Sequence, residues 1–275
     1  MKKLRDLYPG DKVCEAHSGT VFTVAGPAPY CTDGICLITD AVIAQGAMDA
    51  PEPASPEENF PITGNSSYAL SNLHQWLNAD STDWYVPSHP CDTPPTEENL
   101  ALRPTLFDPI RHNAYADSPG FLARFSENFR RHILVSRIPC VKVDGSGLEY
   151  LDAKAFIPSA AELGLETGTP PEGEPFPLFA DFRMRYAAPS EDCLAESAWQ
   201  PAYFQRQRTF WYWLRTPNLT TPGFFAYVHF VNPYAYKFAC SPWMGIRPML
   251  SLSQDMPVES TGSCLGTYRF VEVSK

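Results

Sequence analysis

The sequence predicts one α+β domain, residues 1–275, with a mixed or antiparallel sheet, short helices and long loops. Three observations lead to this prediction. Short β-prone runs separated by glycine-containing turns recur along the chain. Helical periodicity is confined to two or three brief stretches. The 28 prolines exceed average use and favour loops over long helices.

Three stretches carry helix signals. Residues 68–78 have Ser71 as an N-cap and place Trp76 on the apolar face. Residues 120–132 repeat phenylalanine every four positions, a spacing that indicates a packing stripe and not a ligand site. In residues 155–165 a capping box precedes a terminating glycine. The residues of these last two patterns are Phe121, Phe125, Phe129, Ser159, Glu162 and Gly164.

Strands are expected on both sides of these helices. Residues 144–147, Asp-Gly-Ser-Gly, join two of the strands as a hairpin. The proline-rich residues 47–59 and 86–104 are expected to be surface loops. The expected strands cover residues 11–15, 20–25, 35–43, 133–137, 140–143, 148–151, 210–215, 245–252 and 266–273.

The charge of the chain argues against several kinds of partner. A formal net charge of -10 and a pI near 5.0 disfavour nucleic acid, which requires a basic patch, and an anionic membrane surface. The basic N-terminal residues are not followed by an apolar segment, and no run is long enough to span a membrane. We expect synthesis in the cytoplasm without membrane insertion, and leave open later release or association with a virion.

Residues 210–252 hold a third of the aromatic residues, and the rest of the chain is organised around them. Two β-prone runs, 210–215 and 245–252, frame this stretch. Between them the aromatics follow no single period and alternate with proline and asparagine, which favour loops. Loops lie on the surface, and exposed aromatic patches usually bind partners. We therefore expect an aromatic recognition surface here.

Each of these aromatic side chains has a core position as its alternative. Trp211 and Trp213 are expected in the core, since β-prone apolar runs are normally buried. Alternation along a strand would turn Tyr227 and His229 outward. The candidate ligand-binding residues are Phe224, Phe225, Tyr227, His229, Phe230, Asn232, Tyr234, Tyr236, Phe238 and Trp243.

Two arginines, Arg215 and Arg247, stand at the strands that frame the aromatic stretch. One interpretation is an anion or ligand clamp. The favoured interpretation is a pair of buried guanidiniums that donate hydrogen bonds to loop carbonyls and fix the frame.

Sequence motifs for catalysis are absent. The chain has no glycine-rich phosphate loop, no His-Glu-x-x-His and no Gly-x-Ser-x-Gly, and we expect no cofactor and no metal. The eight cysteines include no Cys-x-x-Cys pair and are expected to be reduced thiols, mostly buried. Cys240 and His229 could form a nucleophile pair, although a chain with eight cysteines and six histidines offers many such pairings by chance.

Five segments together resemble a bacterial and phage domain family of unassigned function. The strongest are Trp-Leu-Arg-Thr-Pro at 213–217, Ala-Tyr-Val at 226–228 and Gly-Ile-Arg-Pro-Met-Leu at 245–250. Residues 68–78 and 156–165 resemble two upstream elements of the same family. The resemblance implies a C-type-lectin-like fold of the formylglycine-generating-enzyme-like kind. The calcium motifs of lectins and the paired cysteines of the true enzymes are not recognisable.

Several proteins of this kind resemble the variable proteins of diversity-generating retroelements. In such proteins, adenines in Asn-type codons are replaced at random, and the altered residues form a ligand-binding surface near the C-terminus. The segment 218–242 is rich in the residue types that such codons reach, and Lys237 is its one residue outside the set. The resemblance places the variable segment at about 218–244.

Three functions are compatible with these observations. The leading hypothesis is a non-enzymatic ligand-binding protein whose diversified aromatic surface recognises a protein or glycan. The first alternative is a formylglycine-generating-like enzyme that uses Cys240 or Cys264. The second is a structural phage component whose aromatics pack against another subunit.

Overall fold

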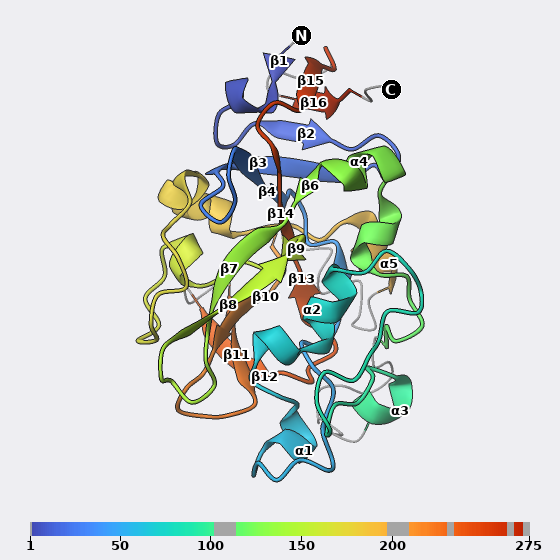
Figure 1. Cartoon of the computed structure of the whole chain (residues 1–275), viewed down its shortest axis with the longest axis vertical. Coiled ribbons are helices and arrows are strands. Elements are labelled where there is room, and N and C mark those ends of the chain that lie inside the picture. The colour runs from blue at the N-terminus through green and yellow to red at the C-terminus, as the bar shows by residue number, and fades with distance from the viewer. Residues whose placement is uncertain (1, 102–113, 197–208, 230–233, 263–266, 272–275) are drawn as a thin grey trace.

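The structure is a computed structural model that describes residues 2–101, 114–196, 209–229, 234–262 and 267–271. Figure 1 shows an elongated molecule with its largest sheet in the upper half and a smaller sheet, near the bottom, that contains β11 and β12. The α+β class with mixed sheets is confirmed, because both parallel and antiparallel strand pairs occur.

The strands in the described residues form three sheets. The nine-stranded sheet has the order β1-β15-β16-β2-β3-β4-β14-β6, with β9 also paired to β14. The five-stranded sheet has the order β12-β11-β10-β13-β5, and β7 and β8 form the expected hairpin. The bounds are β1 Lys2–Lys3, β2 Lys12–Cys14, β3 Val21–Pro27, β4 Gly34–Thr39, β5 Ala44–Gln45, β6 Ile133–Leu134, β7 Ser136–Val141, β8 Leu148–Ala153, β9 Ala155–Phe156, β10 Tyr212–Pro217, β11 Phe224–Val228, β12 Ala235–Phe238, β13 Gly245–Ile246, β14 Met249–Ser253, β15 Pro257–Ser260 and β16 Thr267–Phe270.

The helices in the described residues are short. The α-helices are α1 Phe60–Thr63, α2 Asn72–Leu77, α3 Glu97–Leu100, α4 Glu127–His132 and α5 Glu191–Glu196. The 3₁₀ helices are η1 Leu4–Asp6, η2 Tyr68–Leu70, η3 Phe121–Arg124, η4 Ala161–Leu163, η5 Pro177–Ala180 and η6 Phe182–Arg185. None of the helices in this part of the chain has the length and apolar character that crossing a membrane requires.

The three helices predicted from the sequence are shorter than expected, and serine caps divide the first two of them. The Ser71 hydroxyl accepts the backbone N–H of His74 at 3.2 Å and starts α2 after η2. The Ser126 hydroxyl accepts the N–H of Phe129 at 3.2 Å and separates η3 from α4. The predicted phenylalanine stripe is nevertheless buried: the Phe121 and Phe125 ring centroids lie 5.1 Å apart, and those of Phe125 and Phe129 lie 5.0 Å apart.

The capping box in residues 155–165 is present but starts a 3₁₀ turn and not an α-helix. The Ser159 N–H donates to Glu162 Oε2 at 2.9 Å, and the Glu162 N–H donates to Ser159 Oγ at 3.1 Å. Gly164 ends the turn with φ +68°. The Glu162 carboxylate also accepts hydrogen bonds from Tyr30 and from the buried Arg215.

The predicted strand over 245–252 is two strands in two sheets. β13 pairs with β5 and β10 in the five-stranded sheet, and β14 pairs with β4 in the nine-stranded sheet. Pro248 lies at the break, where a residue without an N–H interrupts a ladder at little cost. Its carbonyl accepts the N–H of Thr39 at 2.9 Å. The chain therefore crosses between sheets at Arg247 and Pro248.

Candidate functional site

Strands β10, β11 and β12 place the aromatic residues on two faces of one sheet. Trp213 lies opposite Tyr227, and Phe225 lies opposite Lys237, so these side chains share a face. Residues at the alternate positions occupy the other face, where Phe224 lies opposite Phe238, and Ala226 lies opposite Tyr236. Within the segment 218–242, where irregular loops were expected, residues 224–228 and 235–238 are thus paired strands.

The first face ends in a group of rings around Trp211, which we call the Trp211 cluster: Trp211, Tyr227, His229 and Trp243. The Trp211 ring centroid lies 5.8 Å from that of Tyr227 and 5.4 Å from that of Trp243. Its centroid is 5.2 Å from the His229 ring at an interplanar angle of 25°, a stacked arrangement. Trp211 and His229 are half-buried, whereas Tyr227 and Trp243 are 8% and 6% exposed.

The second face carries two more aromatic pairs. The Phe224 and Phe238 centroids lie 4.4 Å apart, and those of Tyr234 and Tyr236 lie 5.7 Å apart in an edge-on contact. All four side chains are half-buried. Part of the surface of each ring is therefore exposed.

The sequence-predicted site residues separate into three sets. The prediction that Phe225 lies on the surface is wrong. Its side chain is fully buried against Trp213, with 6.5 Å between the ring centroids. Tyr227 and Trp243 were also predicted at the surface, yet they are 8% and 6% exposed because they pack against Trp211. Phe230 and Asn232 lie outside the described residues. The candidates that keep a substantial exposed surface are Phe224, His229, Tyr234, Tyr236 and Phe238.

Two further residues contact the aromatic side chains of this sheet and were not among the candidates from the sequence. Trp211 was expected in the core, yet it is half-buried and central to the cluster because it precedes β10 and is not covered by a paired strand on both sides. Lys237 was treated only as an exception in the variable segment. Its Nζ lies 4.6 Å from the Trp243 ring centroid and 5.6 Å from that of Phe238, within cation–π range.

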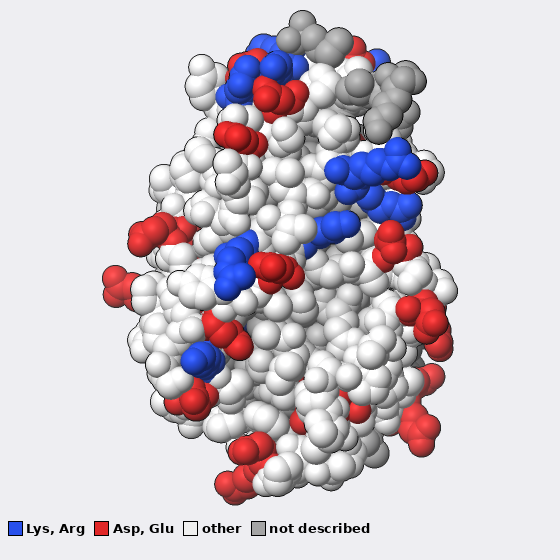
Figure 2. Space-filling view, viewed as in Figure 1, with Lys and Arg blue, Asp and Glu red and all other residues white. Residues whose placement is uncertain are grey.

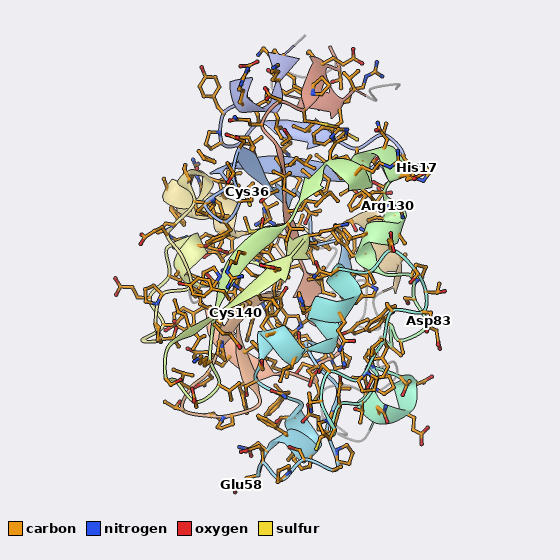
Figure 3. The ribbon with its side chains drawn as sticks, viewed as in Figure 1. His17, Cys36, Glu58, Asp83, Arg130 and Cys140 are labelled. Atoms are coloured by element: carbon orange, nitrogen blue, oxygen red, sulfur yellow. The ribbon has the colours of Figure 1, made fainter. Side chains whose placement is uncertain are left out.

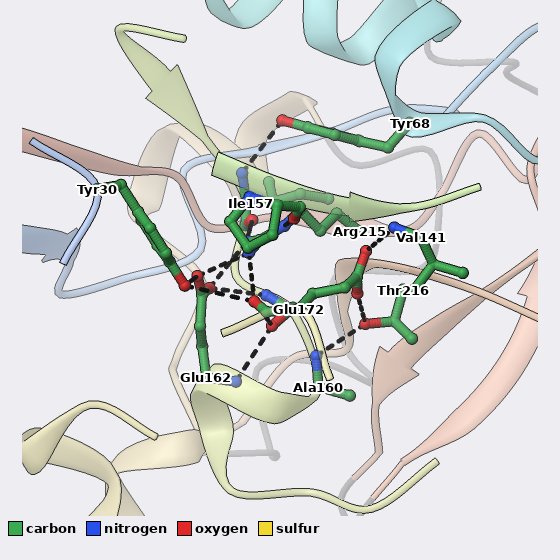
Figure 4. Close-up of polar contacts among 11 residues, drawn as sticks. Tyr30, Tyr68, Val141, Ile157, Ala160, Glu162, Glu172, Arg215 and Thr216 are labelled. Atoms are coloured by element: carbon green, nitrogen blue, oxygen red, sulfur yellow. Dashed lines mark hydrogen bonds and ion pairs between the residues drawn. The ribbon is translucent and has the colours of Figure 1, made fainter. Parts of the chain in front are cut away.

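Arg215, on β10 of the same sheet, lies in a fully buried polar centre (Figure 4). Its Nη1 and Nη2 donate to the two carboxylate oxygens of Glu162 at 2.8 and 2.7 Å. The remaining donors reach the carbonyls of Pro139 at 3.1 Å, Ile157 at 2.9 Å and Glu172 at 2.9 Å. Every guanidinium nitrogen is satisfied inside the protein, so the structural interpretation of Arg215 is confirmed.

A second carboxylate, Glu172, completes this centre. Its Oε1 accepts the N–H of Val141 at 2.9 Å, and its Oε2 accepts the hydroxyl of Thr216. Burial raises the pKa of Glu172, and the Arg215 guanidinium opposes that rise. The Tyr30 hydroxyl donates to Glu162 Oε1 at 2.6 Å, and burial raises the pKa of this phenol. The centre joins β3–β4, β7 and β10 into one frame.

Arg247 has the corresponding role where the chain crosses between sheets. Its Nε donates to the Thr39 carbonyl at 3.0 Å, and its Nη1 donates to the Met184 carbonyl at 3.1 Å. The guanidinium also lies 5.4 Å from the Tyr212 ring centroid. With 2% of its surface exposed, Arg247 fixes loop carbonyls and is unable to act as a surface clamp.

The turn between β10 and β11 is held by the segment around α1. Gly223 has φ +86°, and a Cβ there would lie 1.9 Å from Thr63 Oγ1, so only glycine fits. Its N–H donates to Ser66 Oγ. At the end of β12, the N–H of Cys240 donates to the Thr63 carbonyl at 2.8 Å. We call β11 and β12 the aromatic hairpin. The residue before β11 and the segment after β12 are therefore both held by residues 63–66.

A family model described as "Domain of unknown function (DUF6273)" matches residues 33–254. The chain belongs to this family. No curated protein and no solved structure matches this chain. The match agrees with the expectation of a domain family of unassigned function.

The DUF6273 match contains both the Arg215 centre and the Trp211 cluster, and it excludes one end of the largest sheet. Strands β1, β15, β16, β2 and β3 are consecutive neighbours in that sheet, and all lie outside residues 33–254. They form the upper end of the molecule in Figure 1. The family match thus begins between β3 and β4.

The structure shows the surroundings of several cysteines in the described part of the DUF6273 chain. Cys240 is buried, and its Sγ donates to the Ile62 carbonyl at 3.4 Å, while His229 stacks on Trp211. Figure 3 places Cys36 and Cys140 within the body of the molecule, and burial raises the pKa of the Cys140 thiol to about 12. Cys264 lies outside the described residues. Among those described, no three His, Cys, Asp or Glu side chains converge as metal ligands do.

Proposed function

We propose that this DUF6273 protein is a non-enzymatic ligand-binding protein that presents the aromatic hairpin as its recognition surface. The observation that carries the proposal is the set of half-buried rings on β11, β12 and the residues beside them. Large, stiff aromatic side chains give contact area at a small loss of conformational entropy. The Arg215 centre and residues 63–66 hold the hairpin, so a partner meets a surface that is already ordered.

The finer proposal is a C-type-lectin-like scaffold diversified by a retroelement. It is supported by the positions of the resembling motifs: residues 213–217 lie on β10 with Arg215, and residues 245–250 include Arg247. The resembling motifs therefore fall on the frame, and the segment between them contains β11 and β12. A partner outside the producing cell, protein or glycan, would require release or virion association after synthesis.

Deep sequencing of the coding region across a natural population tests the proposal. Because Phe225 is buried and Phe224 is half-buried, diversification should alter Phe224 and leave position 225 apolar. Variation should gather at the outward positions, listed as Phe224, His229, Tyr234, Tyr236 and Phe238. Arg215, Gly223 and Arg247 should stay fixed. If the segment varies no more than its flanks, the diversification proposal is wrong. The proposal of a binding protein with a fixed sequence would then remain.

A further inference from the structure

Beside the Arg215 centre, residues 161–175 border a cavity of about 590 Å³, a volume in the range of small-molecule sites. Most of the described residues that line it are glycine, alanine, proline or threonine, whose side chains are short. Two residues of the Arg215 centre, Glu172 and Thr216, also line this cavity. Its described lining includes no residue of the aromatic hairpin, so the cavity is a second candidate site.

Hydrogen bonds hold the base of this segment. The Phe176 N–H donates to the Glu162 carbonyl at 2.9 Å. The Glu172 carbonyl accepts Arg215 Nη2 at 2.9 Å and the Ser159 hydroxyl at 3.1 Å. The wall of the cavity is therefore tied to the frame, and a ligand does not have to order it on binding.

The charge of this segment is negative. Residues 161–175 contain four glutamates and neither lysine nor arginine. Glu166 and Glu174 line the cavity and are exposed. Arg185 lies nearby, where its Nη2 donates to the Gly164 carbonyl at 3.4 Å, but it is not among the described lining residues. Figure 2 shows acidic side chains along the left edge of the molecule, where Figure 1 draws the segment in yellow.

The buried carboxylate of Glu172 adds a negative charge beside the cavity. The Arg215 centre contains two carboxylates and one guanidinium, and both terminal nitrogens of that guanidinium bond to Glu162. The oxygens of Glu172 instead accept neutral donors, the Val141 N–H and the Thr216 hydroxyl. Both oxygens act as acceptors, as they do in the ionised form. One negative charge therefore remains after Arg215 has balanced Glu162, and a cation in the cavity would stabilise it.

We infer that this cavity binds a small organic cation, an ammonium group on a short aliphatic chain. Carboxylates of one sign around a cavity concentrate the potential there and attract the ammonium. The aliphatic part packs against the apolar lining, which includes Leu165 and Pro175. A single metal ion fits less well, because among the described residues no three His, Cys, Asp or Glu side chains converge as its ligands. This site is independent of the proposed function.

The test is ligand-observed NMR and calorimetry on the full chain with n-butylamine, n-butanol and butyrate, which share one shape and differ in charge. We expect the amine to bind the wild type at least about tenfold more tightly than the other two probes. Glu172→Gln should weaken amine binding about tenfold, and Glu174→Gln about threefold. Thr169→Trp, which adds bulk to the cavity wall without charge, should abolish it. Glu58→Gln is the control for an exposed glutamate, since Figure 3 places Glu58 at the lower end of the molecule.

A blocked lysine, N-acetyl-lysine methylamide, is the fourth probe. Tighter binding of butylamine supports a free amine as the ligand, and tighter binding of the blocked lysine supports a lysine side chain. Either result agrees with the inferred ammonium site.

Equal binding of butylamine and butanol, or no binding of either amine, overturns the inference. Unchanged amine binding by Thr169→Trp also overturns it, because the amine would then lie outside this cavity. If Glu172→Gln does not fold, Glu174→Gln and Thr169→Trp decide the test, since neither residue belongs to the Arg215 centre. These results leave the proposed function of the aromatic hairpin unchanged, and the population sequencing described above tests that function separately.

Discussion

Arg215 lies on β10, and Trp211 lies four residues earlier, directly before that strand. The two side chains differ in their burial and in the kind of group that they contact. Arg215 is fully buried, and all its donors meet carboxylate or carbonyl acceptors. Trp211 is half-buried and contacts other rings. The comparison teaches that a satisfied polar centre marks the frame, whereas an incompletely covered group of rings marks the place where a partner can add contacts.

The largest expected effect is on the Arg215 centre. Glu162→Gln removes the carboxylate that takes both terminal nitrogens of Arg215 and leaves a buried charge short of its partner. We expect a loss of about 3–5 kcal/mol in the free energy of unfolding, or failure to fold. Urea-induced unfolding of the wild type and of Glu162→Gln measures this loss. Arg269→Gln breaks the exposed pair with Glu259 and should cost about 0–1 kcal/mol. Similar losses from the two variants would contradict the distinction between frame and surface.

Phe225 and Phe224 sharpen the comparison within one strand. Phe225→Ala opens a cavity beside Trp213 and should lower the free energy of unfolding by about 3–4 kcal/mol. Phe224→Ala removes a half-buried ring and should cost about 1–2 kcal/mol. Guanidinium unfolding of the two variants gives the difference. Equal costs would mean that both rings belong to the core.

A pH dependence is expected at His74, which lies beside the frame. Its ring is 5.4 Å from that of Tyr68, whose hydroxyl accepts the N–H of Ile157 at 3.3 Å. Burial lowers the pKa of His74 from 6.5 to about 4. Between these two values the unfolded chain binds a proton that the folded chain does not. The contribution of neutral His74 is therefore present above pH 6.5 and is lost as the pH falls toward 4.

His74→Gln should remove this dependence, because glutamine does not titrate in that range. We expect the wild type to lose about 2–3 kcal/mol more than the variant between pH 7 and pH 4. Taking the difference between the two proteins cancels the opposite slope from Glu172, whose pKa is raised by burial. Parallel curves of unfolding free energy against pH would show that His74 is not held in its neutral form.

Local signals in the sequence predicted much of the fold. Ser71, the Ser159–Glu162 capping box and the hairpin at 144–147 act through residues three or four positions apart, so their spacing is readable from the chain. The buried role of Arg215 was also predicted. Its partner Glu162 is 53 positions away, and the pairing became visible only in the structure.

The candidate site was predicted as a region and not residue by residue. Proline and asparagine around β12 favoured loops, whereas the pairing of β11 with both neighbours gives a regular strand. That pairing turns Phe225 inward and leaves Phe224 half-buried. Burial of Trp211 depends on where β10 begins, and the position of Lys237 depends on Trp243 across the site. Such differences arise from contacts between segments that are distant in the sequence. The strand and loop propensities of single residues do not contain information about these contacts.

The order of strands in the largest sheet has a consequence for how the protein could be mounted on a carrier. β1 and β16, the strands nearest the two ends of the chain, belong to the same end of that sheet, with β15 between them. Figure 1 shows this end at the top and the β11–β12 hairpin in the lower half. A tether at either end would leave the aromatic surface facing away from its support, so both fusion orientations present the same surface to the surroundings.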